Sequence, residues 1–273
     1  MRPRVGHIQF INCLPLYYGL VKNGVLLDVE LTKGTPTELN RHLIEGRLDI
    51  SPISSIEYAR HHRDLILLPD LAVGADGEVR SIILVSRVPL MELGGKTIAL
   101  TSTSATSQAL LQILLRKYGL NCRYFVSPPE LGSMLLEADA ALLIGDPALR
   151  TYFRSHPDLY HYDLGRLWKE LTGLPMVYAV WAARREFVQD SPDLAREVYN
   201  AFHRSMLYSL EHLREIAENA ARWESMDAQT LQEYFRGLEF QLGPSQQAGL
   251  LEYYRQANQE GFLGELPVIE FLQ

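Results

Sequence analysis

Cysteine and basic residues are scarce in this chain of 273 residues. Its two cysteines, Cys13 and Cys122, have no C-x-x-C partner, which excludes a disulfide framework and indicates buried, small apolar side chains. The 26 lysines and arginines are outnumbered by 33 acidic residues, which gives a net charge of −7. Because nucleic-acid-binding proteins usually carry a basic face, this balance argues against nucleic acid as a partner.

Long apolar runs are absent as well. No stretch approaches the roughly 20 apolar residues that a membrane helix needs, so we expect no membrane partner. The first residues, Met1 to His7, lack the apolar core of a signal peptide, and we therefore expect a cytoplasmic protein. Charged residues make up 22% of the chain and hydrophobic residues 47%, which is typical of a globular protein. The chain is long enough for two lobes.

Sequence motifs for common cofactors are missing too. The chain contains no P-loop, no dinucleotide-binding glycine pattern, no H-E-x-x-H motif and no G-x-S-x-G elbow. The one pair of adjacent histidines, His61 and His62, would point to different sides of a helix, which is poor geometry for a metal site. We therefore expect neither a cofactor nor a metal ion, and the oligomeric state stays open.

The sequence does contain an alternation of strand and helix patterns. In its first part this alternation implies a parallel sheet with right-handed crossovers, and a second α/β unit starts near Leu93. We predict an α/β fold of two lobes around a hinge and a central cleft, with residues 1–90 and 184–273 in lobe I and 91–183 in lobe II. The expected strands are 5–10, 26–31, 49–53, 65–73, 80–85, 97–100, 122–126, 140–144 and 175–181. The expected helices start near 36, 54, 108 and 130, and three more cover about 192–212, 228–236 and 244–259.

A run rich in hydroxyl groups follows one of these strands. Residues 101–107 read Thr-Ser-Thr-Ser-Ala-Thr-Ser and precede an apolar helix pattern. A helix N-terminus exposes unpaired N–H groups and a partial positive charge, so this run favours an anion site. Since Ser and Thr are also preferred as N-caps, simple capping is the alternative.

Other strand ends carry polar residues that an α/β fold would place in the same cleft. These are Asn12, Ser54 with Ser55, Ser81, and Gly145 with Asp146. Ligands of such folds bind beyond the carboxyl ends of strands, and uncharged donors suit an oxygen-rich anion. Structural roles remain open: Asn12 can bond its own turn, a serine can cap the next helix, and Asp146 before Pro147 fits an N-cap.

Several segments together resemble one family. They are Phe10-Ile11-Asn12-Cys13-Leu14-Pro15-Leu16 and the ranges 34–40, 46–58, 81–86, 101–107, 144–149, 163–168 and 172–181. Their order and gaps are similar to those of the MqnA family, the chorismate dehydratases of the futalosine route to menaquinone. The resemblance covers about residues 5–185. It implies a type II periplasmic-binding-protein fold and the conversion of chorismate, the small-molecule partner, into 3-[(1-carboxyvinyl)oxy]benzoate.

The resemblance and the residues lead to a hypothesis for the reaction, in which the C4 hydroxyl and the C3 proton of chorismate are lost. Asn12 and Ser81 would hold the substrate near the reacting carbons. The base would be the enolpyruvyl carboxylate of the substrate itself or, alternatively, Asp146. Three other functions remain: a solute-binding protein, the related 1,4-dihydroxy-6-naphthoate synthase, and a ligand sensor. The expected substrate-binding residues are Ser54, Ser55, Thr103, Ser104, Ala105, Thr106 and Gly145.

Overall fold

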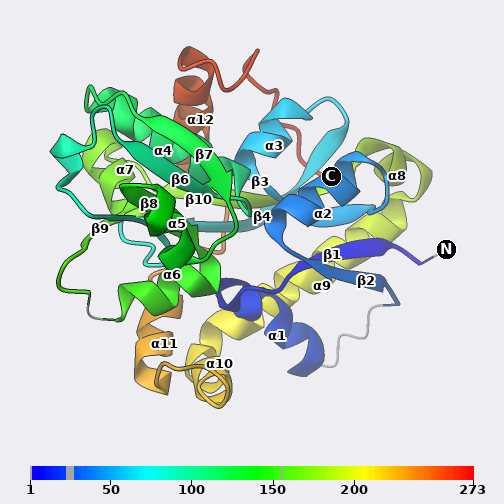
Figure 1. The fold of residues 1–273 in the computed structure, drawn as a ribbon. Coiled ribbons are helices and arrows are strands. Elements are labelled where there is room, and N and C mark those ends of the chain that lie inside the picture. The colour runs from blue at the N-terminus through cyan, green and yellow to red at the C-terminus, as the bar shows by residue number, and fades with distance from the viewer. Residues whose placement is uncertain (1, 23–27, 155) are drawn as a thin grey trace.

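The protein folds into two lobes, each built on a five-stranded sheet (Figure 1). The computed structural model describes residues 2–22, 28–154 and 156–273. The strands are β1 (Arg4–Ile8), β2 (Glu30–Gly34), β3 (Ile50–Ser54), β4 (Leu65–Ala75), β5 (Ile82–Ser86), β6 (Thr97–Thr101), β7 (Arg123–Ser127), β8 (Ala140–Ile144), β9 (Tyr160–Asp163) and β10 (Met176–Arg184).

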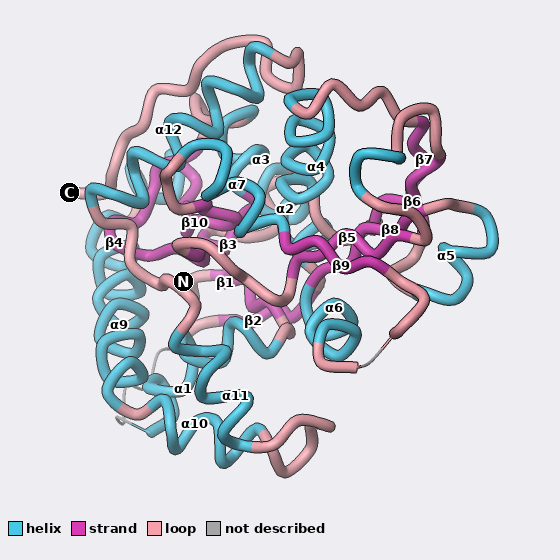
Figure 2. Tube along the Cα trace, turned by 90° about the vertical axis from the view of Figure 1, so that its left-hand side faces the viewer, coloured by secondary structure: helices cyan, strands magenta, loops and turns pink. Residues whose placement is uncertain are grey.

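Helices surround both sheets, as the tube in Figure 2 shows. They are η1 (Ile11–Cys13), α1 (Leu14–Lys22), α2 (Pro36–Ile44), α3 (Ser55–Arg60), η2 (Leu90–Glu92), α4 (Ala105–Lys117), α5 (Leu131–Glu137), α6 (Gly145–Tyr152), α7 (Leu164–Thr172), α8 (Arg185–Asp190), α9 (Pro192–Glu211), α10 (Leu213–Ala220), α11 (Ala228–Arg236) and α12 (Pro244–Gln259). Within the described part of the chain, none of them combines the length and apolar character of a membrane span.

The first sheet has the strand order β2-β1-β3-β10-β4. Strand β1 runs parallel to β2 and β3, but β10 is antiparallel to both β3 and β4. The expected parallel arrangement therefore holds for β1, β2, β3 and β4, and β10 is the exception. The antiparallel strand returns from the other lobe, as expected for the segment 175–181. The predicted strand 26–31 lies partly outside the described residues, and β2 begins later, at Glu30.

The second sheet has the order β7-β6-β8-β5-β9. Its central strand β8 is apolar at every position, and β5 is apolar except at Ser86, because both faces of these strands are covered. On β5, Ile82 and Leu84 pack into the large core, whereas Ile83 and Val85 join a smaller cluster on the opposite face. This two-sided burial explains the continuous apolar run that predicted β8.

The lobe boundaries differ from the predicted ones. The residue pattern placed them near 90 and 183, yet β5 pairs within the second sheet and β10 pairs within the first. The chain therefore crosses between the lobes at 76–81 and again at 173–175. Residue patterns predict that a segment forms a strand, but they do not reveal which sheet will take it as a hydrogen-bond partner.

Local helix signals had mixed success. The capping box of Thr35 and Glu38 forms as expected at the start of α2. The capping box expected over 127–130 was wrong, because Glu130 is itself the N-cap and accepts from the N–H groups of Gly132 and Ser133. The N-cap role of Asp146 was also wrong: the cap position of α6 is Ile144, and Asp146 lies inside the first turn.

Helix α12 braces the two lobes. It packs against β10, α3 and α4, and the hydroxyl of Tyr253 donates to the carbonyl of Thr106 at 3.1 Å. Its Gly249 lies so close to the crossing at 173–175 that an added Cβ would come within 2.0 Å of the carbonyl oxygen of Pro175. This close contact places α12 at one of the two connections about which the lobes can move.

Candidate functional site

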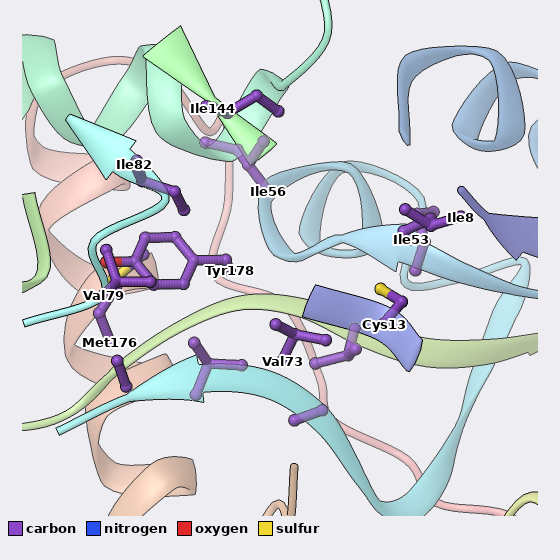
Figure 3. Packing of buried hydrophobic residues seen from close by; sticks show 14 of the residues in the cluster. Ile8, Cys13, Ile53, Ile56, Val73, Val79, Ile82, Ile144, Met176 and Tyr178 are labelled. Atoms are coloured by element: carbon purple, nitrogen blue, oxygen red, sulfur yellow. The ribbon is translucent and has the colours of Figure 1, made fainter. Parts of the chain in front are cut away.

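A small cavity lies between the two lobes. It has a volume of about 50 Å³, well below the roughly 300 Å³ at which ligand pockets usually start. Its walls combine apolar side chains with a few neutral polar ones, and the residues that line it carry no charged side chain. Figure 3 shows part of this wall, with Ile8 and Cys13 on one side and Ile82 and Tyr178 on the other. The lining residues are Ile8, Phe10, Asn12, Cys13, Pro36, Ser54, Val73, Ile82, Ser104, Ser107, Ile144, Gly145, Tyr178 and Ala179.

Several residues of the cavity wall stand at the starts of helices, whereas Tyr178 lies within β10. Asn12 is in η1, which continues directly into α1, and Pro36 is the first residue of α2. Ser104 caps α4, and Gly145 begins α6. Helix starts concentrate unpaired N–H groups and partial positive charge. The partial positive charge of these helix starts favours an anion in the cavity. Pro36 has no N–H, and the N–H groups of Ile11 and Gly145 are already hydrogen-bonded to Asp146 and to the carbonyl of Ser81.

The structure brings four of the predicted site residues to this cavity, namely Asn12, Ser54, Ser104 and Gly145. The other six lie outside its wall, and most of their side chains have defined partners elsewhere. They are Ser55, Ser81, Thr103, Ala105, Thr106 and Asp146.

The hydroxyl run mainly bonds within itself. Ser104 Oγ accepts from the N–H of Ser107 at 3.2 Å, so the capping interpretation is confirmed for this residue. Thr103 and Thr101 join their hydroxyls at 2.8 Å. Thr106 Oγ1 accepts from the N–H of Ile56 in the other lobe at 3.2 Å. Ser104 and Ser107 are the members of the run that face the cavity.

Asn12 and Ser54 are two of the polar side chains that lobe I contributes to the wall. Among the described residues, the buried Oδ1 of Asn12 has no hydrogen-bond partner. A buried acceptor left unpaired costs free energy, so its retention favours contact with a ligand. Ser54 Oγ accepts from Nδ2 of Asn40 at 2.9 Å, and this contact leaves the hydroxyl proton of Ser54 to point elsewhere.

Ser55 and Ser81 are engaged with the backbone instead. Ser55 is fully buried, and its hydroxyl donates to the carbonyl of Val177 at 2.8 Å. Ser81 lies in the crossing before β5, where its hydroxyl contacts the carbonyl of Val79 at 3.3 Å. Its own carbonyl accepts from the N–H of Gly145 at 2.8 Å. Ser81 thus supports the wall of the cavity from behind.

Asp146 reaches across to the other lobe. Its Oδ1 accepts from the N–H of Ile11 at 2.9 Å. Burial raises the pKa of this carboxyl, the bond from Ile11 opposes that rise, and the charges of Glu224 and Arg150 act in opposite directions on it. The carboxylate is therefore a structural acceptor in this arrangement of the lobes.

The sequence prediction missed several lining residues. Phe10 and Tyr178 belong to segments that carried the family resemblance, but an aromatic residue beside a strand is most simply explained as core. The Tyr178 hydroxyl is buried, has no partner among the described residues, and its pKa is raised far above the usual range, chiefly by burial and further by the charge of Asp163. Cys13 is 1% exposed, as expected for a small apolar residue.

The two lobes are closed over the cavity. Besides the bond from Ile11 to Asp146, Thr37 Oγ1 donates to the carbonyl of Ser102 at 3.0 Å. A cavity of this size leaves no room for a drug-sized ligand, so substrate entry requires the lobes to separate.

Small-angle X-ray scattering tests this separation. We expect the free protein in solution to populate open states, and chorismate at saturation to reduce the radius of gyration, because a ligand bound between lobes shifts the equilibrium towards closure. A radius of gyration that chorismate leaves unchanged would contradict ligand-driven closure.

The sequence as a whole was then compared with known families and proteins. A family model described as menaquinone biosynthesis matches residues 3–259. This chain belongs to that family. A chorismate dehydratase of Thermus thermophilus is 36% identical to it and is matched over 92% of this chain and 93% of its own length. A 1,4-dihydroxy-6-naphtoate synthase of the same organism is 30% identical over 78% of this chain and 76% of its own length.

Solved structures show the fold of this menaquinone biosynthesis family member. A protein from Archaeoglobus fulgidus superposes with a TM-score of 0.81 at 22% identity, covering 96% of this chain and 98% of that one. The aliphatic sulphonate binding protein of Escherichia coli, a periplasmic protein, superposes with a TM-score of 0.68 at 14% identity, covering 97% and 89%. The predicted two-lobed periplasmic-binding-protein fold is therefore confirmed.

Proposed function

We propose that this protein is a chorismate dehydratase, a hydro-lyase that removes water from chorismate to give 3-[(1-carboxyvinyl)oxy]benzoate. The observation that carries the proposal is the cavity in which four helix starts converge on apolar walls. Chorismate is a dianion with an unsaturated ring and one hydroxyl. Its carboxylates suit the partial positive charge at the helix starts, and its ring suits Phe10, Ile82 and Tyr178.

The similarity to the chorismate dehydratase of Thermus thermophilus supports the same conclusion. The naphtoate synthase matches at lower identity and over less of the chain. Periplasmic binding proteins share the fold, so the fold does not distinguish an enzyme from a solute-binding protein. Binding of chorismate without turnover is the outcome that a solute-binding protein would give.

The reaction requires the protein mainly to position the substrate and to stabilise the charge that develops in the transition state. In the elimination, a base takes the C3 proton, the C3–H electron pair forms the C3=C4 double bond, and the C4–O bond breaks. The base passes its proton to the departing hydroxide, which leaves as water. The product is aromatic, so the driving force is large. The barrier comes from a poor leaving group and a weakly acidic C–H bond, which positioned donors in a dry site can lower.

We assign roles to the predicted residues on this basis. Asn12 contacts the reacting part of the substrate, and Ser81 acts from behind the wall by holding the backbone of Gly145. Ser54, Ser104 and Gly145 bind substrate oxygens. Since no charged side chain lies in the wall, the enolpyruvyl carboxylate of chorismate is the base. The remaining predicted residues, Ser55, Thr103, Ala105 and Thr106, support the helix starts rather than the reaction.

The proposal is tested with purified protein and chorismate, without added cofactor. We expect chorismate to lose one water, seen as a mass decrease of about 18 Da, and to gain the ultraviolet absorbance of a substituted benzoate. A heat-denatured sample controls for spontaneous decay of chorismate. Unchanged chorismate that binds tightly would reject the enzyme and favour the solute-binding protein. We also propose a cytoplasmic location, which fractionation of cells that express the protein tests.

A further inference from the structure

The turn that carries Asn12 receives a cap from the opposite lobe. Helix η1 begins at Ile11 and runs without a break into α1, so the N–H of Ile11 is one of the unpaired donors of a helix start. Its acceptor is Oδ1 of Asp146 at 2.9 Å, which is 135 residues further along the chain and belongs to α6. A carboxylate in this place also interacts favourably with the helix dipole.

A second contact fixes the same two segments. Gly145 has a φ of +62°, and an added Cβ would lie 2.9 Å from the ring of Phe10. The Phe10 ring therefore lies directly against the backbone at the start of α6. Figure 1 shows α6 beside the start of α1, in agreement with the contacts between α6 and η1. The segment that precedes Asn12 and the segment that precedes Asp146 are therefore in direct contact when the lobes are closed.

One turn further along α6, an ion pair fastens the helix to the C-terminal helices. The guanidinium of Arg150 donates to both carboxylate oxygens of Glu224, at 3.0 and 3.2 Å from Nη2. The Glu224 side chain is only 9% exposed, and it lies between α10 and α11. Two adjacent turns of α6 are therefore held, one by the Asp146–Ile11 hydrogen bond and the next by the Arg150–Glu224 ion pair. The position of Asp146 relative to Ile11 thus depends on more than its own hydrogen bond.

We propose that Asp146 is a positioning residue that couples closure of the cleft to the orientation of Asn12. Separation of the lobes breaks the bond between Asp146 and Ile11 and removes the cap from the turn. Closure restores the cap and turns the unpaired Oδ1 of Asn12 into the cavity. This inference rests on the proposed function, because it assigns Asn12 to the reacting substrate. The carboxylate acts through Ile11 and not as the base.

Two substitutions of Asp146 distinguish a positioning role from that of a base. Asparagine keeps an oxygen that accepts from Ile11 but has no basicity, whereas alanine has neither. We expect D146A to lower kcat for chorismate about tenfold or more, since small misplacements of catalytic groups are costly, while D146N stays within about threefold of the wild type. The KM values of both variants should change less than kcat.

A matched control removes a cap that lies within one lobe. Asp227 caps α11 by accepting from the N–H of Thr230 at 2.8 Å, far along the chain from the cleft residues. D227A should lose stability without a comparable fall in kcat, which separates the loss of a cap from the loss of coupling. Thermal melts of all three variants verify that they fold.

Hydrogen exchange gives a measurement that does not depend on turnover. The Ile11 amide of D146A should exchange about tenfold faster than in the wild type, and that of D146N should not. If the wild type does not convert chorismate but the exchange result holds, the proposed function fails and the coupling stands. Wild-type kcat in D146A would overturn the coupling. A D146N variant as inactive as D146A would identify Asp146 as the base.

Discussion

Replacing Asn12 with alanine is expected to lower kcat for chorismate by more than tenfold, which corresponds to about 1.4 kcal/mol or more in the barrier. Asn12 lines the cavity, and its Oδ1 is buried without a partner among the described residues. A buried acceptor without a partner lowers the stability of the fold, and a hydrogen bond with the substrate would satisfy it. Steady-state kinetics with chorismate measure the effect.

Two variants make this test specific. N121A removes an exposed asparagine from a loop before β7 and should leave kcat unchanged. N12D keeps the shape of the side chain but adds a negative charge, which a dianionic substrate would oppose, so its KM should rise. If N12A retained near-normal kinetics and lost only stability, Asn12 would be a residue of its turn and would leave the catalytic assignment.

Replacing Gly145 with alanine is expected to destabilise the protein by about 2–4 kcal/mol and to lower kcat for chorismate. Two costs add here. The backbone has a φ of +62°, which L-residues adopt unfavourably, and the new Cβ would come within 2.9 Å of the Phe10 ring. Since Phe10 and Gly145 both line the cavity, displacement of the ring would also change the substrate site. Chemical denaturation and chorismate turnover measure the two effects.

A second glycine separates these costs. Gly95, which lies outside both crossings between the lobes, has a φ of +75°, and nothing lies within 4 Å of an added Cβ, so G95A introduces the backbone strain alone. We expect it to cost about 1 kcal/mol and to leave kcat unchanged. Combining F10A with G145A should remove the steric part of the cost, because the two residues are in contact and their effects should not be additive. Equal losses for G145A and G95A would show that the Phe10 contact is unimportant.

The positions of most elements could be predicted because they follow from local patterns. The strand of residues 140–144 was predicted with its observed bounds, since β8 is apolar at every position. The helix of residues 244–259 was also predicted, and α12 has those bounds, with a proline at its first position. Such patterns depend on neighbours within about four residues, which the sequence shows directly.

The site was predicted less completely, because its side chains find partners far away in the chain. Asp146 before Pro147 had the sequence of an N-cap, but its acceptor oxygen is used by Ile11 in the other lobe. Thr106 similarly accepts from Ile56. The hydroxyl of Ser55 turns to Val177 and not to the cavity. The local pattern around these residues contains no information about those partners.

The sequence by itself therefore determined that polar, uncharged residues would follow the strands and begin the helices. This is a consequence of capping preferences and of apolar strand patterns. Only the tertiary structure decided which of these helix starts converge, and it selected those with Asn12, Pro36, Ser104 and Gly145. The reason is geometric. A helix start contributes to an anion site when it faces other helix starts across the cleft, and the pairing of strands in the two sheets decides which ones do so. That pairing joins segments that are far apart in the sequence.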